Sequence, residues 1–421
     1  MISIARLALS AALMIAPLLV SRASAGDASA VPVRAAAEAL ASLGLVTHLD
    51  YRDSPYGNLE RVAGALQYVG IRRVRDMIPD ANAGPYEQMA AQGVRFDLVV
   101  RGGKIGDLDA AIGKAVALQT RFPGSVTSIE GLNEANLFPA SLRDLSGFAA
   151  AAAVQRETFA AVKASPALRT VPVYALSLGG AGTKEFDSLG DVSDAADMGN
   201  AHVYFGTRPP TDTFDFATKL ARRSTPRLPK LVITETGYAS SGKPHQAVNE
   251  AVQARYLLTL IAETWRRDTA ATYLYQLVDY KVAPDDWSHN LGLYRNDWSA
   301  KPAAGAIHNL TSAVGAVASE RSGAPCTADI ELTGKPIAPR ALRLGAPHGC
   351  ALLVWLAQPL WNDLTNSPLT IAMQPVQLSL HPAPAVISIV DPLDGSYRQL
   401  RLGDSGFDLA LGDHPLLLRW H

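Results

Sequence analysis

The sequence predicts an α/β protein in which a closed (β/α)8 barrel, of the TIM barrel class, precedes a small antiparallel β-sandwich. Short, continuously apolar runs alternate with segments of helical periodicity, as strands covered by helices should do. The runs are residues 45–49, 71–74, 94–100, 126–132, 171–178, 198–205, 231–234 and 272–278. Eight strand–helix units in series favour a closed barrel. An open, doubly wound sheet is the competing topology.

Helix start and stop signals lie between these runs. They are Asn58 to Gly70, Asp107 to Pro123, a capping-box pattern at residues 141–144, and a long amphipathic stretch from Gln246 to Arg267. We expect each of these helices to connect two successive parallel strands.

A change in composition after the last helical segment predicts a domain boundary. We expect the barrel to span residues 26–318 and the sandwich to span residues 322–421. In the second range, two strand-like stretches, 386–390 and 396–401, flank the turn sequence Pro392-Leu-Asp-Gly395. This pattern is typical of a β-hairpin.

Residues 1–25 predict a cleaved signal peptide. Arg6 precedes an apolar run from Leu7 to Val20, and Ala23-Ser-Ala25 has the small-residue pattern of a cleavage site. The run is shorter than the roughly 20 residues that a membrane span requires, and we expect no span elsewhere. We therefore expect a secreted or periplasmic protein, and we expect it to be a monomer.

The charge balance excludes one class of partner. Lysine and arginine number 38 and aspartate and glutamate 39, so the formal net charge is 38 − 39 = −1. Nucleic acid binding depends on a basic surface that displaces counterions, and we expect no nucleic acid partner. A neutral substrate suits this charge better.

The two cysteines, Cys326 and Cys350, stand near the C-terminal end of the chain. In an oxidising compartment they could form one disulfide. Two buried, unpaired thiols are the alternative.

Two glutamates stand where predicted strands end. The fourth run is followed by Asn133-Glu134, and the seventh by Glu235. The C-terminal ends of barrel strands meet at one mouth, where such barrels carry their active sites. A pair of carboxyl groups in one cleft suits cleavage of a glycosidic bond, because one can protonate the leaving oxygen while the other, ionised, attacks the anomeric carbon.

These residues resemble glycoside hydrolase clan A, barrel glycosidases whose acid/base and nucleophile occupy strands 4 and 7. Asn133-Glu134, Glu235 and His202-Val-Tyr204 carry the resemblance, which covers most of residues 45–310 and is closest to the cellulase-like family 5 and the xylosidase-like family 39. It implies a retaining glycoside hydrolase that cleaves a β-linked oligo- or polysaccharide. It implies that Glu134 is the acid/base and Glu235 the nucleophile.

The resemblance also implies roles for the residues around the pair. Asn133 would hydrogen-bond the sugar 2-hydroxyl, and Arg75 would pair with the nucleophile and keep it ionised. Tyr204 would hydrogen-bond the same carboxylate, and His202 would line the sugar site. Taken singly, Arg75 could instead form an ion pair with a neighbouring aspartate, and His202 and Tyr204 could be core residues.

The chain departs from family 5 on two strands. It reads Val99-Val-Arg101 where a histidine is usual on strand 3, and Tyr275-Gln-Leu277 where a tryptophan is usual on strand 8. Trp287, in the loop after the eighth run, offers a stacking face for the sugar instead. It could also be a packing residue.

Other chemistries leave little trace in the sequence. The nine histidines form no HxH or HExxH pair, and the chain has no GxSxG, P-loop or GxGxxG pattern. We expect no metal and no cofactor. Two alternatives stay open: a carbohydrate-binding protein on a barrel without catalysis, and a metal-dependent hydrolase on the same fold.

Overall fold

The computed structural model describes residues 31–80, 82–106, 108–321, 326–401 and 406–420. The described residues, from Val31 to Trp420, form one compact unit. The predicted signal peptide lies outside the described residues, as does Asp107, and the signal peptide stays a prediction. Among the described helices, none combines the length and the apolar character that a bilayer crossing needs.

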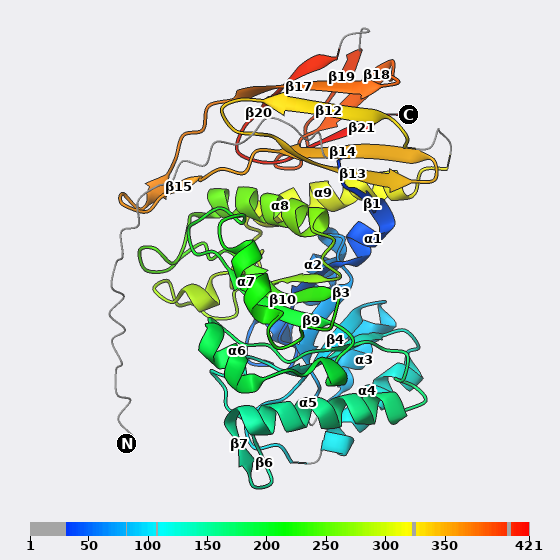
Figure 1. Ribbon diagram of the computed structural model, residues 1–421, viewed down its shortest axis with the longest axis vertical. Helices are drawn as coiled ribbons and strands as arrows, with labels where there is room; N and C mark the ends of the chain where they lie inside the picture. The colour runs from blue at the N-terminus through cyan, green and yellow to red at the C-terminus, as the bar shows by residue number, and fades with distance from the viewer. Residues whose placement is uncertain (1–30, 81, 107, 322–325, 402–405, 421) are drawn as a thin grey trace. The chain divides into compact units, whose positions relative to one another are not determined.

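A parallel sheet of eight strands forms the barrel (Figure 1). Each strand overlaps one of the predicted runs. The strands are β2 (Leu43–Val46), β3 (Arg73–Met77), β4 (Arg95–Val100), β5 (Val126–Leu132), β8 (Val173–Tyr174), β9 (Gly199–Tyr204), β10 (Leu231–Gly237) and β11 (Thr272–Leu274). Their order is β8-β5-β4-β3-β2-β11-β10-β9.

The two ends of this sheet meet, so the barrel is closed. Tyr174 of β8 forms a parallel bridge with Met198, just before β9. The amide of Ala175 donates to the Met198 carbonyl at 3.0 Å, and the amide of Asp197 donates to the Val173 carbonyl at 2.7 Å. The open-sheet alternative is therefore wrong.

Helices cover the outside of the barrel (Figure 1). Asn58 caps its helix by accepting a hydrogen bond from the amide of Arg61 at 3.1 Å, and Asn249 caps another by accepting from Val252 at 2.8 Å. The helices are α1 (Ala36–Ala41), α2 (Leu59–Tyr68), α3 (Gly84–Ala91), α4 (Leu108–Arg121), α5 (Gly147–Ala164), α6 (Thr183–Leu189), α7 (Phe214–Ala221), α8 (Glu250–Arg266) and α9 (Pro302–Ala318).

The predicted capping box at residues 141–144 is wrong. These residues belong to a small hairpin of β6 (Ser141–Leu142) and β7 (Leu145–Ser146), and α5 begins only at Gly147. The backbone of Ser141 is engaged elsewhere: its amide donates to Gly103 and its carbonyl accepts from Ile105, both at 2.9 Å. Pairing with a distant segment has outweighed the local helix signal.

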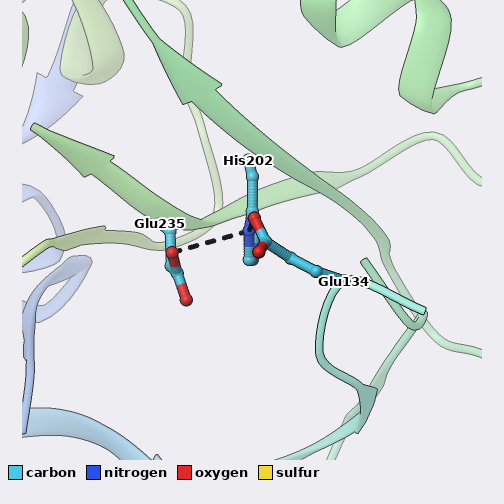
Figure 2. A group of neighbouring side chains, drawn as sticks. All are labelled: Glu134, His202 and Glu235. Atoms are coloured by element: carbon cyan, nitrogen blue, oxygen red, sulfur yellow. Dashed lines mark hydrogen bonds and ion pairs between the residues drawn. The ribbon is translucent and has the colours of Figure 1, made fainter. Parts of the chain in front are cut away.

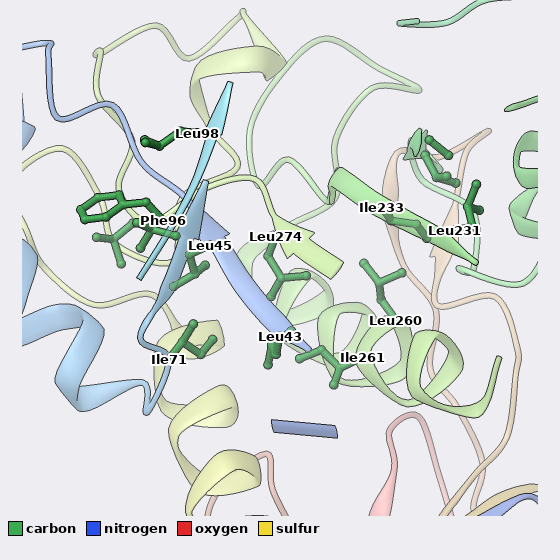
Figure 3. Close-up of a cluster of buried hydrophobic side chains, with 14 of the residues drawn as sticks. Leu43, Leu45, Ile71, Phe96, Leu98, Leu231, Ile233, Leu260, Ile261 and Leu274 are labelled. Carbon is green, nitrogen blue, oxygen red and sulfur yellow. The ribbon is translucent and has the colours of Figure 1, made fainter. Parts of the chain in front are cut away.

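The apolar core lies between the strands and the helices. Figure 3 shows part of it, including Leu43 and Leu274 from two adjacent strands and Leu260 and Ile261 from α8. Successive side chains of a strand point to opposite faces. The inward face of several strands is polar rather than apolar, and these buried polar residues are Arg75, Asp97, Ser128, Glu130, Asn200 and Thr234.

The C-terminal segment forms two antiparallel layers with an apolar core between them. One sheet has the order β1-β13-β14-β21-β18-β19, and the other has the order β12-β17-β20. The strands are β12 (Asp329–Gly334), β13 (Arg340–Ala346), β14 (Gly349–Trp355), β17 (Gln374–His381), β18 (Val386–Val390), β19 (Tyr397–Arg401), β20 (Phe407–Leu411) and β21 (Leu416–Trp420), and a separate hairpin is formed by β15 (Trp361–Asn362) and β16 (Ser367–Pro368).

Two details of this part were open in the sequence. The hairpin around Gly395 is present, with β18 and β19 paired antiparallel. Cys326 and Cys350 form a disulfide, with their Cα atoms 5.0 Å apart. The larger sheet also takes its edge strand from the other end of the chain, because β1 (Val33–Ala35) pairs parallel with β13. No pattern in the sequence predicted that strand.

The sandwich is joined to the barrel through a buried carboxylate. Glu263 of α8 is fully buried, and its Oε1 accepts hydrogen bonds from Arg340 and from the indole of Trp355, both at 2.9 Å. Arg255 of the same helix pairs with Asp413 at 2.8 Å. These contacts hold α8, and with it the barrel, against the larger sheet.

Candidate active site

The two predicted glutamates come together at the C-terminal mouth of the barrel. Glu134 follows β5, and Glu235 lies near the end of β10. Three atoms lie within 4.8 Å of one another: a carboxylate oxygen of Glu134, a carboxylate oxygen of Glu235 and a ring nitrogen of His202. Figure 2 shows the imidazole of His202 beside both carboxyl groups. Residues 101 positions apart in the chain therefore share one site.

Glu235 is buried among groups that favour its ionised form. Arg75 Nη1 lies 2.6 Å from its Oε1, and the Tyr204 hydroxyl donates to its Oε2 at 2.9 Å. Nδ1 of His202 lies 3.6 Å from Oε2. Burial alone would raise the pKa of Glu235, but His202, Arg75 and the Tyr204 hydrogen bond outweigh it, and the pKa is lowered.

Arg75 links Glu235 to a third carboxylate that the sequence analysis missed. Its Nε and Nη2 donate to the two oxygens of Glu130 at 2.7 and 2.8 Å, and Nη2 also donates to Oδ1 of Asn133 at 2.6 Å. The alternative pairing of Arg75 with a neighbouring aspartate is thus not the arrangement found. A glutamate inside the run Ile129-Glu130-Gly131 was the available signal, because a carboxylate in mid-strand needs an interior partner.

The hydrogen bonds of His202 define which ring nitrogen carries a proton. Nδ1 lies 2.9 Å from Oε1 of Glu134, and Nε2 lies 3.1 Å from Oγ1 of Thr234. The single hydroxyl proton of Thr234 faces two acceptors, Asn200 Oδ1 at 2.8 Å and Glu130 Oε1 at 3.2 Å. Thr234 therefore accepts from Nε2–H, and in a neutral imidazole Nδ1 is left as an acceptor.

His202 and Glu134 share a hydrogen bond beside the ionised Glu235, with Nδ1 and Oε1 2.9 Å apart. Because Nε2–H is donated to Thr234, the proton of this second hydrogen bond lies between the ring and the Glu134 carboxyl group. The site thus contains a pair that holds one proton, Glu134 with His202, next to a charged carboxylate.

The backbone around Glu134 is adapted to this position. Glu134 itself has a φ of 43°, in the left-handed region that residues other than glycine rarely adopt. Its amide donates to the Ser177 hydroxyl at 3.0 Å. Gly179 lies so close that a Cβ there would collide with the Glu134 carboxylate. Glycine at position 179 is what leaves room for the side chain.

Trp287 lies beside the site rather than in its hydrogen-bond network. Its ring meets Tyr204 edge to face, with the ring centroids 5.5 Å apart. Both residues line a cavity of about 190 Å³ whose other walls are mainly apolar. The remaining lining residues are Gly206, Gly237, Ala239, His245, Gln246 and Leu291.

An aromatic cluster centred on His48 also lines the mouth, and its role was missed in the sequence. His48 stacks on Tyr51 at 4.7 Å and meets the ring edges of Tyr56 and Tyr275 at 5.5 and 5.7 Å. Burial lowers the pKa of His48 to about 4, so the ring is neutral. Its Nε2 is buried and has no hydrogen-bond partner among the described residues. The signal was its place just after β2.

Glu134, His202 and Glu235 also have the geometry of a three-ligand metal group. The surrounding charges do not suit one. Glu235 is already paired with the Arg75 guanidinium at 2.6 Å, and a divalent ion bound by Glu235 would face that cation in a buried site. The donor set therefore fits a metal ion poorly.

Comparison with known proteins places this geometry on a known fold. No protein-family profile and no curated protein matches the sequence. Solved structures do match. A family 39 glycoside hydrolase from Bacteroides cellulosilyticus WH2 has a TM-score of 0.62 at 14% identity, over 90% of this chain and 81% of that one.

Two further structures agree. The family 39 enzyme from Xanthomonas axonopodis pv. citri has a TM-score of 0.56 at 14% identity, over 93% of this chain and 97% of that one. A glucosidase from Croceicoccus marinus has a TM-score of 0.55 at 12% identity, over 85% and 91%. The chain has the fold of these glycoside hydrolases. The barrel and the C-terminal antiparallel sheets predicted from the sequence are both part of that likeness.

Proposed function

We propose that this chain is a retaining glycoside hydrolase that cleaves a β-linked saccharide by double displacement. One observation carries the proposal: carboxylate oxygens of Glu134 and Glu235 lie within 4.8 Å of each other. Retaining enzymes hold their two carboxyl groups about 5 to 5.5 Å apart, and inverting enzymes about 6.5 to 9.5 Å. The short separation leaves no room for a water molecule between the nucleophile and the sugar.

Glu235 is the nucleophile in this proposal. Its lowered pKa keeps it ionised, and Arg75 and Tyr204 hold its two oxygens in fixed directions. One oxygen attacks the anomeric carbon, the bond from that carbon to the leaving oxygen breaks, and a glycosyl-enzyme ester forms. The Tyr204 hydroxyl and the guanidinium then stay in place to receive the carboxylate when the ester is hydrolysed.

Glu134 is the general acid and then the general base. The proton that it shares with His202 passes to the leaving oxygen as the glycosidic bond breaks. In the second step Glu134 takes a proton from the water that attacks the ester. His202 is a positioning residue, because its contact with Thr234 fixes the ring nitrogen that faces Glu134.

The residues around the pair would bind the sugar. The amide oxygen of Asn133 is occupied by Arg75, so the amide hydrogens are the ones to donate to the sugar 2-hydroxyl. Trp287 would stack on the substrate from the loop after β11. The stacked rings of His48 and Tyr51 add apolar faces for the sugar.

Trapping the covalent intermediate tests the proposal directly. A panel of 2-fluoro aryl glycosides slows the second step, and the mass of the protein should rise by one fluoroglycosyl group. Peptide mapping should place that group on Glu235. Labelling of another carboxylate, or turnover with inversion of the anomeric centre, would contradict the mechanism.

We also propose that the chain is exported from the cytoplasm. The disulfide between Cys326 and Cys350 supports this, because disulfides persist in oxidising compartments. Expression of the full sequence with a C-terminal tag, followed by N-terminal sequencing of the secreted product, tests it. A product that begins at Gly26 would agree with the predicted cleavage site, and an intact Met1 would argue against it.

A further inference from the structure

The reacting pair divides the mouth of the barrel into two unequal parts. Glu134 follows β5 and Glu235 stands on β10. Around the closed barrel, the strands β4, β3, β2 and β11 lie between them on one side, and β8 and β9 lie between them on the other. We call these parts the β2 half and the β9 half.

The β2 half has the chemistry of a sugar site. The charged groups at its strand ends are paired, as with Arg101 and Asp50 at 2.7 Å. The His48 cluster adds aromatic faces. The side-chain amide of Asn133 lies toward this half, because its Oδ1 accepts a hydrogen bond from Arg75 of β3. Polar groups between aromatic faces match the hydroxyls and the C–H faces of a pyranose.

The apolar cavity lies over β10, between the loops that follow β9 and β11, where the two halves meet. Tyr204 comes from β9, Ala239 follows β10, and Trp287 reaches over from the loop after β11 to contact Tyr204. Ala239 and Leu291 are almost fully buried in the cavity wall. An apolar cavity of roughly 150 Å³ holds a benzene molecule, so about 190 Å³ holds a group of one ring or a short alkyl chain.

A second apolar feature lies beside the acid/base. Leu137 and Phe138 follow Glu134 by three and four residues, and they are 56% and 57% exposed. A Cβ at Gly179, which follows β8, would lie 2.9 Å from Cδ1 of Leu137 and would also collide with Glu134. The exposed leucine is therefore next to the carboxyl group that protonates the leaving oxygen. These two neighbouring side chains offer an apolar contact surface beside the acid/base.

We propose that the substrate of this site is a glycoside with an apolar leaving group, an aryl or alkyl alcohol, and that this group lies in the apolar cavity against Trp287. The inference rests on the proposed function and specifies its substrate class. The bond between the anomeric carbon and the leaving oxygen breaks, Glu235 bonds to that carbon, and the proton of Glu134 completes the released alcohol. Water then frees the sugar and returns a proton to Glu134.

The glycone and the leaving group are assigned to different parts of the mouth because each must contact different residues. The glycone must contact Asn133 and Glu235, which places it over the β2 half. The leaving oxygen must face Glu134, and the group beyond it extends away from the β2 half, toward the apolar cavity. A second sugar there would bring some of its hydroxyls against the buried apolar side chains of Leu291 and Ala239, while Tyr204, His245 and Gln246 supply the polar groups of the cavity.

The test compares leaving groups of equal reactivity and different apolar size. Octyl and methyl glycosides release alkoxides of similar basicity. The ratio of their kcat/KM values therefore reports contacts to the alkyl chain. Both compounds carry the same sugar, the one that the enzyme releases fastest from the 4-nitrophenyl β-glucoside, β-galactoside and β-xyloside. A missing methylene contact in an apolar pocket changes kcat/KM by roughly 10- to 200-fold, and we expect the wild-type octyl-to-methyl ratio to exceed about ten.

Variants of the cavity wall locate the effect. Trp287→Ala should bring the ratio toward one, and Trp287→Phe should keep most of it. Ala239→Leu fills the cavity without removing a wall and should lower the ratio as well. Trp298→Ala is the matched control, because that tryptophan packs on Tyr294 outside the cavity. The ratio cancels any general loss of activity, including one transmitted through Tyr204.

The outcomes separate this inference from the function on which it rests. Turnover of the glycosides with an octyl-to-methyl ratio near one would overturn the apolar leaving group alone. So would a Trp287→Ala variant that loses both activities equally, or a disaccharide cleaved much faster than the octyl glycoside. Absence of turnover of every glycoside in the panel would overturn the proposed function and the inference together.

Discussion

The hydroxyl of Thr234 accepts a hydrogen bond from Nε2 of His202 at 3.1 Å, and this contact decides that Nδ1 of the ring faces Glu134. The hydroxyl of Thr234 forms no hydrogen bond with Glu134 or Glu235, the two residues whose carboxyl groups lie beside His202. It acts by having a single hydroxyl proton, which it donates to Asn200 or Glu130. In the proposed mechanism, the proton that Glu134 donates is thus positioned from inside the barrel.

Replacing Thr234 should therefore impair the proton transfer more than the binding. Thr234→Val removes the acceptor for Nε2–H, and the ring is then free to present Nδ1–H to Glu134. We expect kcat to fall most for glycosides with basic leaving groups, by up to the roughly 10²–10⁴-fold that general acid catalysis supplies. The measurement is kcat across a series of aryl glycosides, and Thr234→Ser should restore it. An equal loss for every leaving group would point to a structural role only.

Substituting the two glutamates should have different signatures. Glu235→Gln should abolish turnover of all glycosides, because an amide does not attack the anomeric carbon. Glu134→Ala should still form the glycosyl-enzyme from 2,4-dinitrophenyl glycosides, whose leaving group needs no proton. Sodium azide should then accelerate release of the sugar as a β-glycosyl azide, identified by NMR. An α-azide, or rescue of Glu235→Gln rather than of Glu134→Ala, would reverse the assignment.

Loss of Arg75 should shift the acid limb of the pH profile. Arg75→Met removes the cation that helps to lower the pKa of Glu235, so that pKa rises and the ionised nucleophile appears only at higher pH. We expect the acid limb of kcat/KM to move upward. Breaking a buried ion pair costs roughly 3–5 kcal/mol of stability. Adding Glu130→Gln should recover part of that free energy of unfolding, since it removes a buried charge left without its partner.

His414 should make the stability of the sandwich depend on pH. Burial alone would lower the pKa of His414, but hydrogen bonds to Asp391 and Asp413 raise it to about 9. The folded pKa exceeds the unfolded value near 6.5, so the protonated ring stabilises the fold fully below about pH 6.5, and this contribution is lost as the pH rises through 9. Its upper limit is about 3 kcal/mol.

Denaturant unfolding of His414→Gln measures that contribution. The variant should be less stable than the wild type at pH 6, and the difference should shrink toward pH 10. Asp413 also pairs with Arg255 of α8, so the contact between sandwich and barrel is the one to weaken. A difference that stays constant between pH 6 and pH 10 would show that the side chain acts by packing alone.

Removing the disulfide should lower the stability without affecting catalysis. Cys326 and Cys350 are 24 residues apart, and closing a loop of that size stabilises a protein by about 3 kcal/mol. The double variant Cys326→Ser with Cys350→Ser should show this loss in urea unfolding. Treating the wild type with reductant should have a similar effect. The variant should remain insensitive to reductant, which separates the disulfide from other effects of the reagent.

Much of the fold was predictable because it depends on local patterns. Apolar runs mark barrel strands wherever one face packs on helices, and Asn58 marks a helix start through its own side chain. The prediction failed at Ser141, where the backbone pairs with Gly103 and Ile105, segments that no local signal connects. It also missed β1, because a three-residue strand has too little sequence to be recognised without its partner β13.

The sequence by itself determined which side chains stand at the strand ends, and with them Glu134, Glu235, Arg75 and His202. Only the tertiary structure decided what these groups do to one another. Closure between Tyr174 and Met198 brings the strands into a ring, and side chains that alternate along each strand then meet inside it. The contact between Arg75 and Glu130 joins two strands that are far apart in the sequence. No local pattern along the chain shows that two such residues lie close together in space.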